Sequence, residues 1–260
     1  MIRFRCTSAL VLAILLYAAD IRTARADFVV VSGTADPWLA GMPDLSTAGP
    51  IGETAGNSNN TRQSPALAAG TGTLIPLTAG SALTFQVSGG PVGYGPGVAR
   101  ESGPNGMLYL GTLNIQHIAG AVNAIGNYRG PINALLGVFL DNSQPNLTPA
   151  PSTLDFSASG GTGFSSLSPG LKQVFFIGNG LDALNNLRTI IVPQGATRLF
   201  LGVADGEEWS NNTGSFDVSI GSSSGVHVAS LPEPASLVLF AVGGIVAFGY
   251  GAARGKRRPA

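Results

Sequence analysis

The stretch Gly195–Gly221, GATRLFLGVADGEEWSNNTGSFDVSIG, contains two strand signals on either side of a polar loop. Arg198–Val203 is a short apolar-rich run, and Ser215–Ile220 alternates apolar and polar residues as a half-buried antiparallel strand does. Five similar runs precede them along the chain: Phe28–Val31, Leu83–Val87, Leu135–Leu140, Gln173–Ile177 and Thr189–Val192. No segment between them has a long helical period. We therefore predict an all-β fold, an antiparallel β-sandwich over residues 27–221.

Two polar segments without strand signals are expected to be surface loops. Asp36–Gln63 contains Gly, Asn, Ser and Pro throughout, and Pro145–Ala150 contains two prolines. Trp38, near the start of the first segment, is expected to be a hydrophobic plug that closes one end of the sandwich.

The loop inside the opening stretch is rich in oxygen-bearing side chains. They are Asp205, Glu207, Glu208, Asn211 and Asn212, with no His or Cys among them. Calcium takes six to eight oxygen ligands and accepts carboxylates, amides and carbonyls, so this composition suits a calcium site. The same residues also favour turns, and a solvated hairpin without metal is the alternative interpretation.

The loop resembles the C-terminal part of the PA-I-type galactophilic bacterial lectins, which are small β-sandwiches that bind sugar through calcium. In that family an Asp ends one strand, two adjacent Asn residues follow, and Ser/Thr-Gly-Ser-Phe opens the last strand. The matching residues here are Asp205, Asn211, Asn212 and Thr213–Phe216. Two backbone carbonyls of the family's calcium shell correspond to Glu208, ahead of Trp209, and to Tyr94 in Tyr94-Gly95-Pro96. The spacing from the Asp to the first Asn is one residue shorter here.

The resemblance implies a jelly-roll or lectin-like sandwich, a bound Ca²⁺ and a carbohydrate ligand, either galactose-like or an exopolysaccharide. Gln116 and His117 are the nearest counterparts of the family's sugar-contacting Gln and His. Trp209 could stack on a sugar ring, and its alternative role is a loop anchor packed against the sheet edge.

Two other functions are alternatives to sugar binding. A structural envelope or biofilm-matrix protein without sugar binding needs only the fold. An enzyme would need a nucleophile with a base, or paired carboxylates, and no nucleophile motif is present. Glu207 and Glu208 are adjacent in sequence, so in an extended segment they would point to opposite faces. We therefore expect a non-catalytic protein.

The N-terminal segment 1–26 has the pattern of a cleaved signal peptide. Arg3 and Arg5 precede the apolar run Ala9–Ala19, and an A-x-A pattern closes at Ala26. The run is too short to span a bilayer, which needs about 20 residues. The only cysteine, Cys6, lies in this segment, so the mature chain is expected to contain neither disulfides nor thiolate metal sites.

The C-terminal segment has three parts after a Ser/Gly-rich linker at 222–231. Pro232, Glu233 and Pro234 open it, residues 234–253 carry no charge, and residues 254–260 include four basic side chains. This order resembles the PEP-CTERM sorting signal. The resemblance implies a single transmembrane helix at 234–253 and processing by an exosortase-type sorting enzyme, with the proline-flanked glutamate as the processing signal. The basic end would stay cytoplasmic, which places the ectodomain outside, in the cell envelope or beyond it.

The ectodomain is acidic, although the whole chain has a formal charge of zero. Between Asp27 and Leu231 there are twelve acidic residues and six basic ones. Because nucleic-acid binding depends on neutralising phosphates, this balance argues against a nucleic-acid partner. It is compatible with binding a cation.

Overall fold

The computed structural model describes residues 27–43, 45–49, 66–70 and 77–223, and the chain divides into one unit that ends at Ser223 and a second at 224–260. The predicted signal peptide (1–26) and the predicted C-terminal sorting segment (232–260) lie outside the described residues. Within the described part, no helix is long and apolar enough to cross a membrane.

All seven runs that were expected to form strands do so, and the fold is all-β, as predicted. Five strands form one sheet in the order β1-β14-β3-β12-β10, and four form another in the order β11-β8-β13-β2. The first sheet consists of β1 (Asp27–Ser32), β14 (Ser215–Ser223), β3 (Ala82–Gly89), β12 (Thr189–Ile191) and β10 (Ser166–Leu167). The second consists of β11 (Val174–Phe176), β8 (Leu135–Leu140), β13 (Arg198–Val203) and β2 (Ala66–Gly70).

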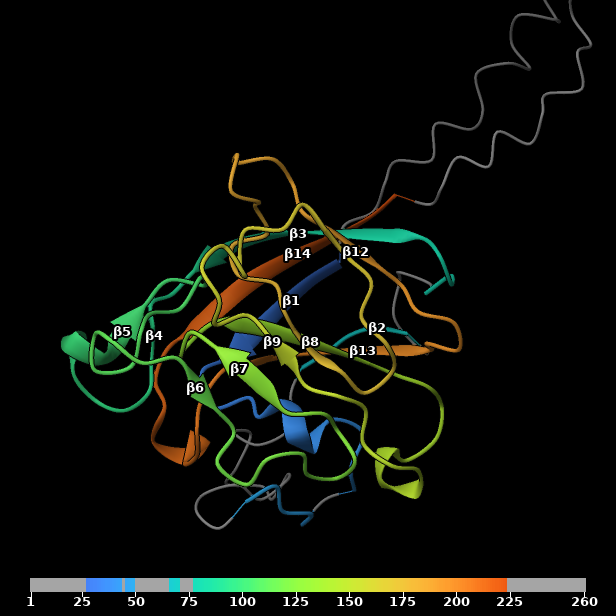
Figure 1. Ribbon diagram of the computed structural model, residues 1–260, viewed down its shortest axis with the longest axis horizontal. Helices are drawn as coiled ribbons and strands as arrows, with labels where there is room; N and C mark the ends of the chain where they lie inside the picture. The colour runs from blue at the N-terminus through green and yellow to red at the C-terminus, as the bar shows by residue number, and fades with distance from the viewer. Residues whose placement is uncertain (1–26, 44, 50–65, 71–76, 224–260) are drawn as a thin grey trace, which may run out of the picture. The chain divides into compact units, whose positions relative to one another are not determined.

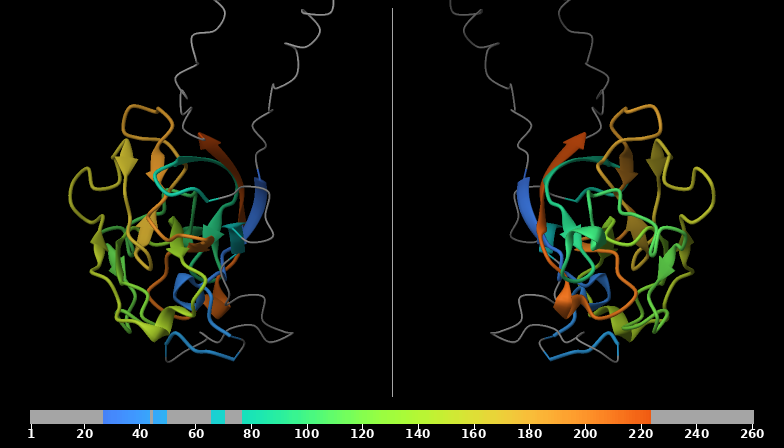
Figure 2. Two further views of the ribbon diagram at one scale, coloured as in Figure 1. Left: turned by 90° about the vertical axis from the view of Figure 1, so that its right-hand side faces the viewer. Right: turned by 90° about the vertical axis from the view of Figure 1, so that its left-hand side faces the viewer.

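The two sheets contribute to one apolar core (Figures 1 and 2). In β14 the alternation read from the sequence places Phe216, Val218 and Ile220 in the core. All six residues of β8 are buried, as their continuous apolar run requires in a strand covered on both faces. Figure 2 shows β1 beside β14 along one side of the molecule, as their antiparallel register also requires. The arrangement is that of a β-sandwich.

Smaller elements connect the strands of these sheets. β4 (Val92–Gly93) pairs with β5 (Glu101–Ser102), and β6 (Ile115–Gln116), β7 (Tyr128–Gly130) and β9 (Leu154–Asp155) form a three-stranded sheet. The 3₁₀ helices are η1 (Pro37–Leu39), η2 (Val98–Arg100), η3 (Pro145–Leu147) and η4 (Trp209–Asn211). The pairs β10–β12 and β7–β9 are parallel, so the prediction of a purely antiparallel fold is wrong at these two short pairs.

The prediction of a surface loop over Asp36–Gln63 is wrong at its start. Residues 36–40 are buried, and η1 begins where the Asp36 carboxylate accepts a hydrogen bond from Trp38 N at 2.8 Å. Trp38 is fully buried and donates from Nε1 to the Gly126 carbonyl at 3.1 Å. Its expected role as a hydrophobic plug is therefore confirmed. The strand β2 had no sequence signal, because its residues Ala66–Gly70 are small and none is β-branched.

A buried arginine fastens the loops beside β12. The Arg188 guanidinium donates to the carbonyls of Ile177 at 2.7 Å, Leu181 at 2.8 Å and Phe164 at 3.2 Å, and also to that of Thr162. It also lies over the rings of Phe164 and Phe176, 4.1 and 4.9 Å from their centroids. Burial lowers the pKa of Arg188 to about 10, against the opposing effect of Asp182. The side chain thus stays charged at neutral pH and serves four carbonyls from three chain segments.

We expect Arg188→Met to lower the free energy of unfolding by about 3 kcal/mol, because the carbonyls lose their donor inside the protein. Arg188→Lys should recover only part of the loss, since an ammonium group cannot reach all four carbonyls. Urea unfolding with an unchanged m-value measures the effect. The exposed Arg129 is the control, and Arg129→Met should change stability by less than about 0.5 kcal/mol. Equal effects at the two positions would contradict this role.

Candidate functional site

The candidate site is assembled by a backbone bridge between two distant segments. Gly93 N donates to Thr213 O at 3.1 Å, and Thr213 N donates to Gly93 O at 2.9 Å. This bridge places the chain that follows β4 against the loop between β13 and β14. Gly214 makes the approach possible, because it has φ +77° and a Cβ there would stand 2.0 Å from the Pro91 carbonyl oxygen. Tyr94 consequently lies beside Asn211, although more than a hundred residues separate them in sequence.

Two amide oxygens in this loop are buried and have no hydrogen-bond donor among the residues that the structure describes. They are Oδ1 of Asn211 and Oδ1 of Asn212. The orientation of the Asn212 amide is set by its nitrogen, which donates to the Gly33 carbonyl at 3.0 Å. Asp205, the first residue of the predicted shell, is 6% exposed and accepts from Gly206 N at 2.6 Å. Most buried acceptors in proteins find a donor, so two bare amide oxygens in the loop that also carries the buried Asp205 are unusual. Amide and carboxylate oxygens are ligands that a hard cation accepts.

Gly95 is buried close to the Asn211 amide oxygen. A Cβ built on Gly95 would stand 3.5 Å from Asn211 Oδ1 and 2.8 Å from Arg100 Nη1. Gly95 has φ +131°, a backbone conformation that L side chains rarely adopt. The absence of a side chain therefore lets the Tyr94–Gly95 backbone pack close to the Asn211 amide oxygen.

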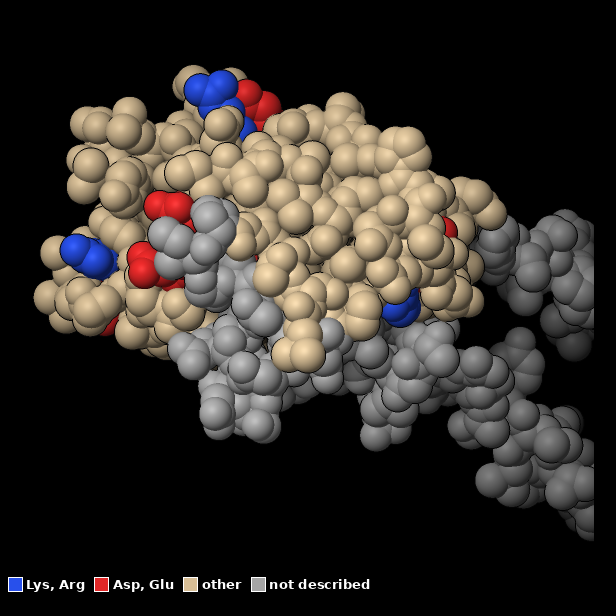
Figure 3. Space-filling model, turned by 90° about the horizontal axis from the view of Figure 1, so that it is seen from below, with Lys and Arg blue, Asp and Glu red and all other residues tan. Residues whose placement is uncertain are grey.

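The site opens into a cavity of about 390 Å³. It lies between the segment after β4, the chain around β6 and the loop after β13. Its lining residues are Tyr94, Arg100, Tyr109, Leu110, Ile115, Gln116, Ile118, Ile132, Asp205, Gly206, Glu207, Glu208 and Asn211. Three of its side chains are acidic and one is basic. Figure 3 shows few charged side chains on the face that it presents: both signs occur at its left end and upper edge, and a further one of each sign lies on the right.

The structure brings together most of the residues that the sequence singled out. Tyr94, Asp205, Glu208 and Asn211 all line the cavity, together with Gln116, while Asn212 lies buried next to Asn211. Glu208 has φ +66° and caps η4, and its carbonyl accepts from Asn211 N at 3.1 Å. Among the described residues no trio of His, Cys, Asp and Glu converges at metal-binding distance. The predicted shell is of a different kind, with one carboxylate beside amide and carbonyl oxygens.

Two of the three residues predicted to contact sugar are buried. Trp209 and His117 are both 0% exposed, so neither ring has a face that a sugar could reach. Trp209 donates from Nε1 to the Val203 carbonyl at 2.9 Å, which is the role of a loop anchor. Trp38 stacks on His117 with centroids 4.2 Å apart and meets Trp209 edge-on at 5.6 Å. The three rings form a wall behind the loop that carries Asp205.

The sequence missed three residues that shape the cavity. Arg100 and Tyr109 line it, and Tyr109 packs edge-on against Tyr94 with centroids 5.3 Å apart. The buried Asn133 donates from Nδ2 to the Arg100 carbonyl at 2.8 Å and thereby fixes the backbone of that segment. All three come from segments without periodicity. The only local signal was the Tyr94-Gly95-Pro96 motif just ahead of Arg100.

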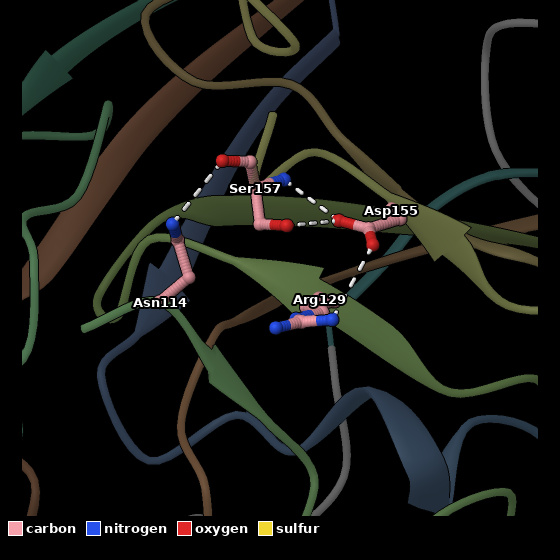
Figure 4. Close-up of polar contacts among 4 residues, drawn as sticks. All are labelled: Asn114, Arg129, Asp155 and Ser157. Atoms are coloured by element: carbon pink, nitrogen blue, oxygen red, sulfur yellow. Dashed lines mark hydrogen bonds and ion pairs between the residues drawn. The ribbon is translucent and has the colours of Figure 1, made fainter. Parts of the chain in front are cut away.

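A second polar cluster lies on the three-stranded sheet, outside the cavity lining (Figure 4). Asp155 accepts from Ser157 Oγ at 2.5 Å and from Ser157 N at 2.8 Å, and Arg129 approaches its other oxygen at 3.7 Å. These contacts, led by the Ser157 hydroxyl, lower the pKa of Asp155. Asn114 joins the cluster through the Ser157 carbonyl at 3.4 Å. A carboxylate with a lowered pKa is a poor base for activating a serine. The ion pair between Arg129 and Asp155 instead joins the neighbouring strands β7 and β9.

No family model and no curated protein matches the sequence. Among solved structures, one described as "EclA N-terminal domain; PllA-like lectin" aligns with 75% of this chain and 95% of its own, at 15% sequence identity and a TM-score of 0.33. A TM-score of this size does not establish a shared fold.

We expect His117→Ala to lower the free energy of unfolding by about 2–4 kcal/mol, because it leaves a cavity between two indole rings. The chain has two tryptophans, both in this cluster, so quenching of their fluorescence by acrylamide should rise in the variant. The exposed neighbour Gln116 is the control, and Gln116→Ala should leave both stability and quenching nearly unchanged. A His117→Ala variant as stable as Gln116→Ala would show that the ring is free to meet a ligand.

Proposed function

We propose that this chain is a non-catalytic, calcium-dependent carbohydrate-binding protein that acts outside the cell. The observation that carries the proposal is the pair of bare amide oxygens, Asn211 Oδ1 and Asn212 Oδ1, beside the buried Asp205. A protein retains buried acceptors without donors at a cost in stability of about 1–3 kcal/mol each. A ligand that supplies the missing positive charge explains why the loop keeps them.

The residues present fit a hard divalent cation. Calcium would be held by the side chains of Asp205, Asn211 and Asn212 and by the carbonyls of Tyr94 and Glu208, all oxygen ligands of the kind it prefers. Bound there, calcium would supply open coordination positions for sugar hydroxyls. The cavity has room beyond the cation for a sugar ring, with Gln116 exposed at its wall and two tyrosine rings beside it.

The location is proposed from the termini. The segment at 1–26 supports export, and the tripartite segment at 232–260 supports transient anchoring in the inner membrane before an exosortase-type enzyme acts at Pro232–Pro234. An exported protein with this cavity would meet the cell's own exopolysaccharide, which is its proposed partner.

Calcium should stabilise the protein against heat in a saturable manner. At a calcium concentration one hundred times Kd, the expected gain is about 2.7 kcal/mol, and magnesium should give a much smaller shift because it demands tighter octahedral geometry. In the variant Asn211→Ala/Asn212→Ala the calcium-dependent gain should disappear. In EDTA the same variant should differ from the wild type by no more than about 1–2 kcal/mol, because the loss of two unsatisfied acceptors is offset by the loss of the hydrogen bond from Asn212 to Gly33.

The matched control is Asn142→Ala, an exposed asparagine beyond the far end of β8. It should keep the full calcium response. A double variant that is destabilised in EDTA and still responds to calcium would contradict the proposed shell. No response of the wild type to millimolar calcium would favour the alternative, a structural matrix protein whose loop is a plain turn.

A further inference from the structure

The cavity contains one positively charged side chain, Arg100, and no counter-ion for it lies among the described residues. Among the described residues the Arg100 guanidinium makes neither a hydrogen bond nor an ion pair, although Asp205, Glu207 and Glu208 line the same cavity. Its contact is with Tyr94, whose ring centroid lies 5.7 Å away. A guanidinium group can bind a carboxylate or phosphate through two parallel N–H donors, and those of Arg100 are available to a ligand in the cavity.

Hydrogen bonds hold the backbone of Arg100 in place, so the position of its Cα relative to the cavity is fixed. Arg100 N donates to the Gly97 carbonyl at 2.9 Å, which closes η2. The Arg100 carbonyl accepts from Asn133 Nδ2 at 2.8 Å and from Tyr94 N at 3.4 Å. Asn133 is buried and has φ +63°. Its backbone N donates to the carbonyl of Ala204, the residue before Asp205, at 2.7 Å. The arginine and the acidic loop are therefore fastened to the same residue.

The guanidinium and the candidate cation site face one spot. A single atom placed where a Cβ of Gly95 would be lies 2.8 Å from Arg100 Nη1 and 3.5 Å from Asn211 Oδ1. A ligand held at the amide oxygens would thus come within reach of the guanidinium. The aromatic pair Tyr94 and Tyr109 lies alongside, which offers ring faces for the C–H groups of a pyranose.

We propose that the sugar bound here is acidic, and that Arg100 selects it by pairing with the carboxylate of a hexuronic acid. This inference rests on the proposed function, because it names the class of sugar for the same cavity. The hydroxyls of a neutral sugar find partners in amide and carboxylate oxygens, but they leave the guanidinium without an acceptor. A uronic acid can pair with the amide and carboxylate oxygens and also with the guanidinium, since one monosaccharide carries hydroxyls and a carboxylate. The planar carboxylate also matches the two parallel N–H donors of the guanidinium.

The test compares galacturonic acid with galactose, and glucuronic acid with glucose, by calorimetric titration of the full protein in saturating calcium. A charge-assisted hydrogen bond contributes about 1.5–3 kcal/mol, so at least one uronic acid should bind about tenfold or more tighter than its neutral partner. Arg100→Gln should reduce this ratio to near one. The preference should also fall as salt is added, because the pair is partly exposed.

Arg129→Gln is the matched control, since Arg129 is exposed and lies outside the cavity lining. It should leave the ratio of uronic to neutral sugar unchanged. Equal binding of both members of each pair, or a ratio that survives Arg100→Gln, would overturn the role of Arg100 while leaving calcium-dependent sugar binding intact. Binding of no sugar together with no thermal shift in calcium would overturn the proposed function as well. Tighter binding of galactose 6-sulfate than of galacturonic acid would replace the carboxylate by a sulfate ester and overturn the uronic acid assignment.

Discussion

The arrangement of the candidate site depends on the bridge between Gly93 and Thr213. Its two hydrogen bonds, 3.1 and 2.9 Å long, join the end of β4 to the loop just before β14. A third segment meets them, because a Cβ on Gly33 would stand 2.4 Å from the Thr213 carbonyl oxygen. Such backbone-to-backbone approach is possible only where side chains are absent. Every oxygen of the predicted shell belongs to one of the two bridged segments, so the shell exists only once the sheets have formed.

The loop between β13 and β14 is rigidly supported and yet contains buried oxygens whose hydrogen-bonding capacity is not satisfied. Behind it, Trp209 is fully buried and tied to Val203, and the rings of Trp38 and His117 fill the space beyond. In front of it, two amide oxygens have no donor. Binding sites require side chains held in place before the ligand arrives, and they often carry a stability cost for that reason. Here the rings of Trp38, His117 and Trp209 make the loop rigid, and the two amide oxygens without a donor lower the stability of the fold.

The opposite treatment of two arginines illustrates how context sets their roles. Arg188 is buried and donates to four carbonyls, so its charge is consumed in holding loops together. Arg100 is exposed in the cavity and stacks near a tyrosine ring. Arg188 therefore stabilises the fold, whereas the N–H donors of Arg100 remain available to a ligand. Nothing in the residues next to either arginine in the sequence distinguishes them.

The sequence by itself determined the strands and the polar loop. Periodicity two and apolar runs located seven strands, and the clustered Asp and Asn residues of 205–212 marked the candidate site, because these are properties of neighbouring residues. The prediction that Tyr94 lies near that loop came only from the resemblance to the galactophilic lectins. Tertiary structure alone decided that His117 and Trp209 turn inward, that Ala66–Gly70 pairs as a strand, and that Arg100 and Tyr109 reach the cavity. Those outcomes depend on which distant segments pair, and hydrogen bonds such as the one between Asn133 and Arg100 have no counterpart in local sequence.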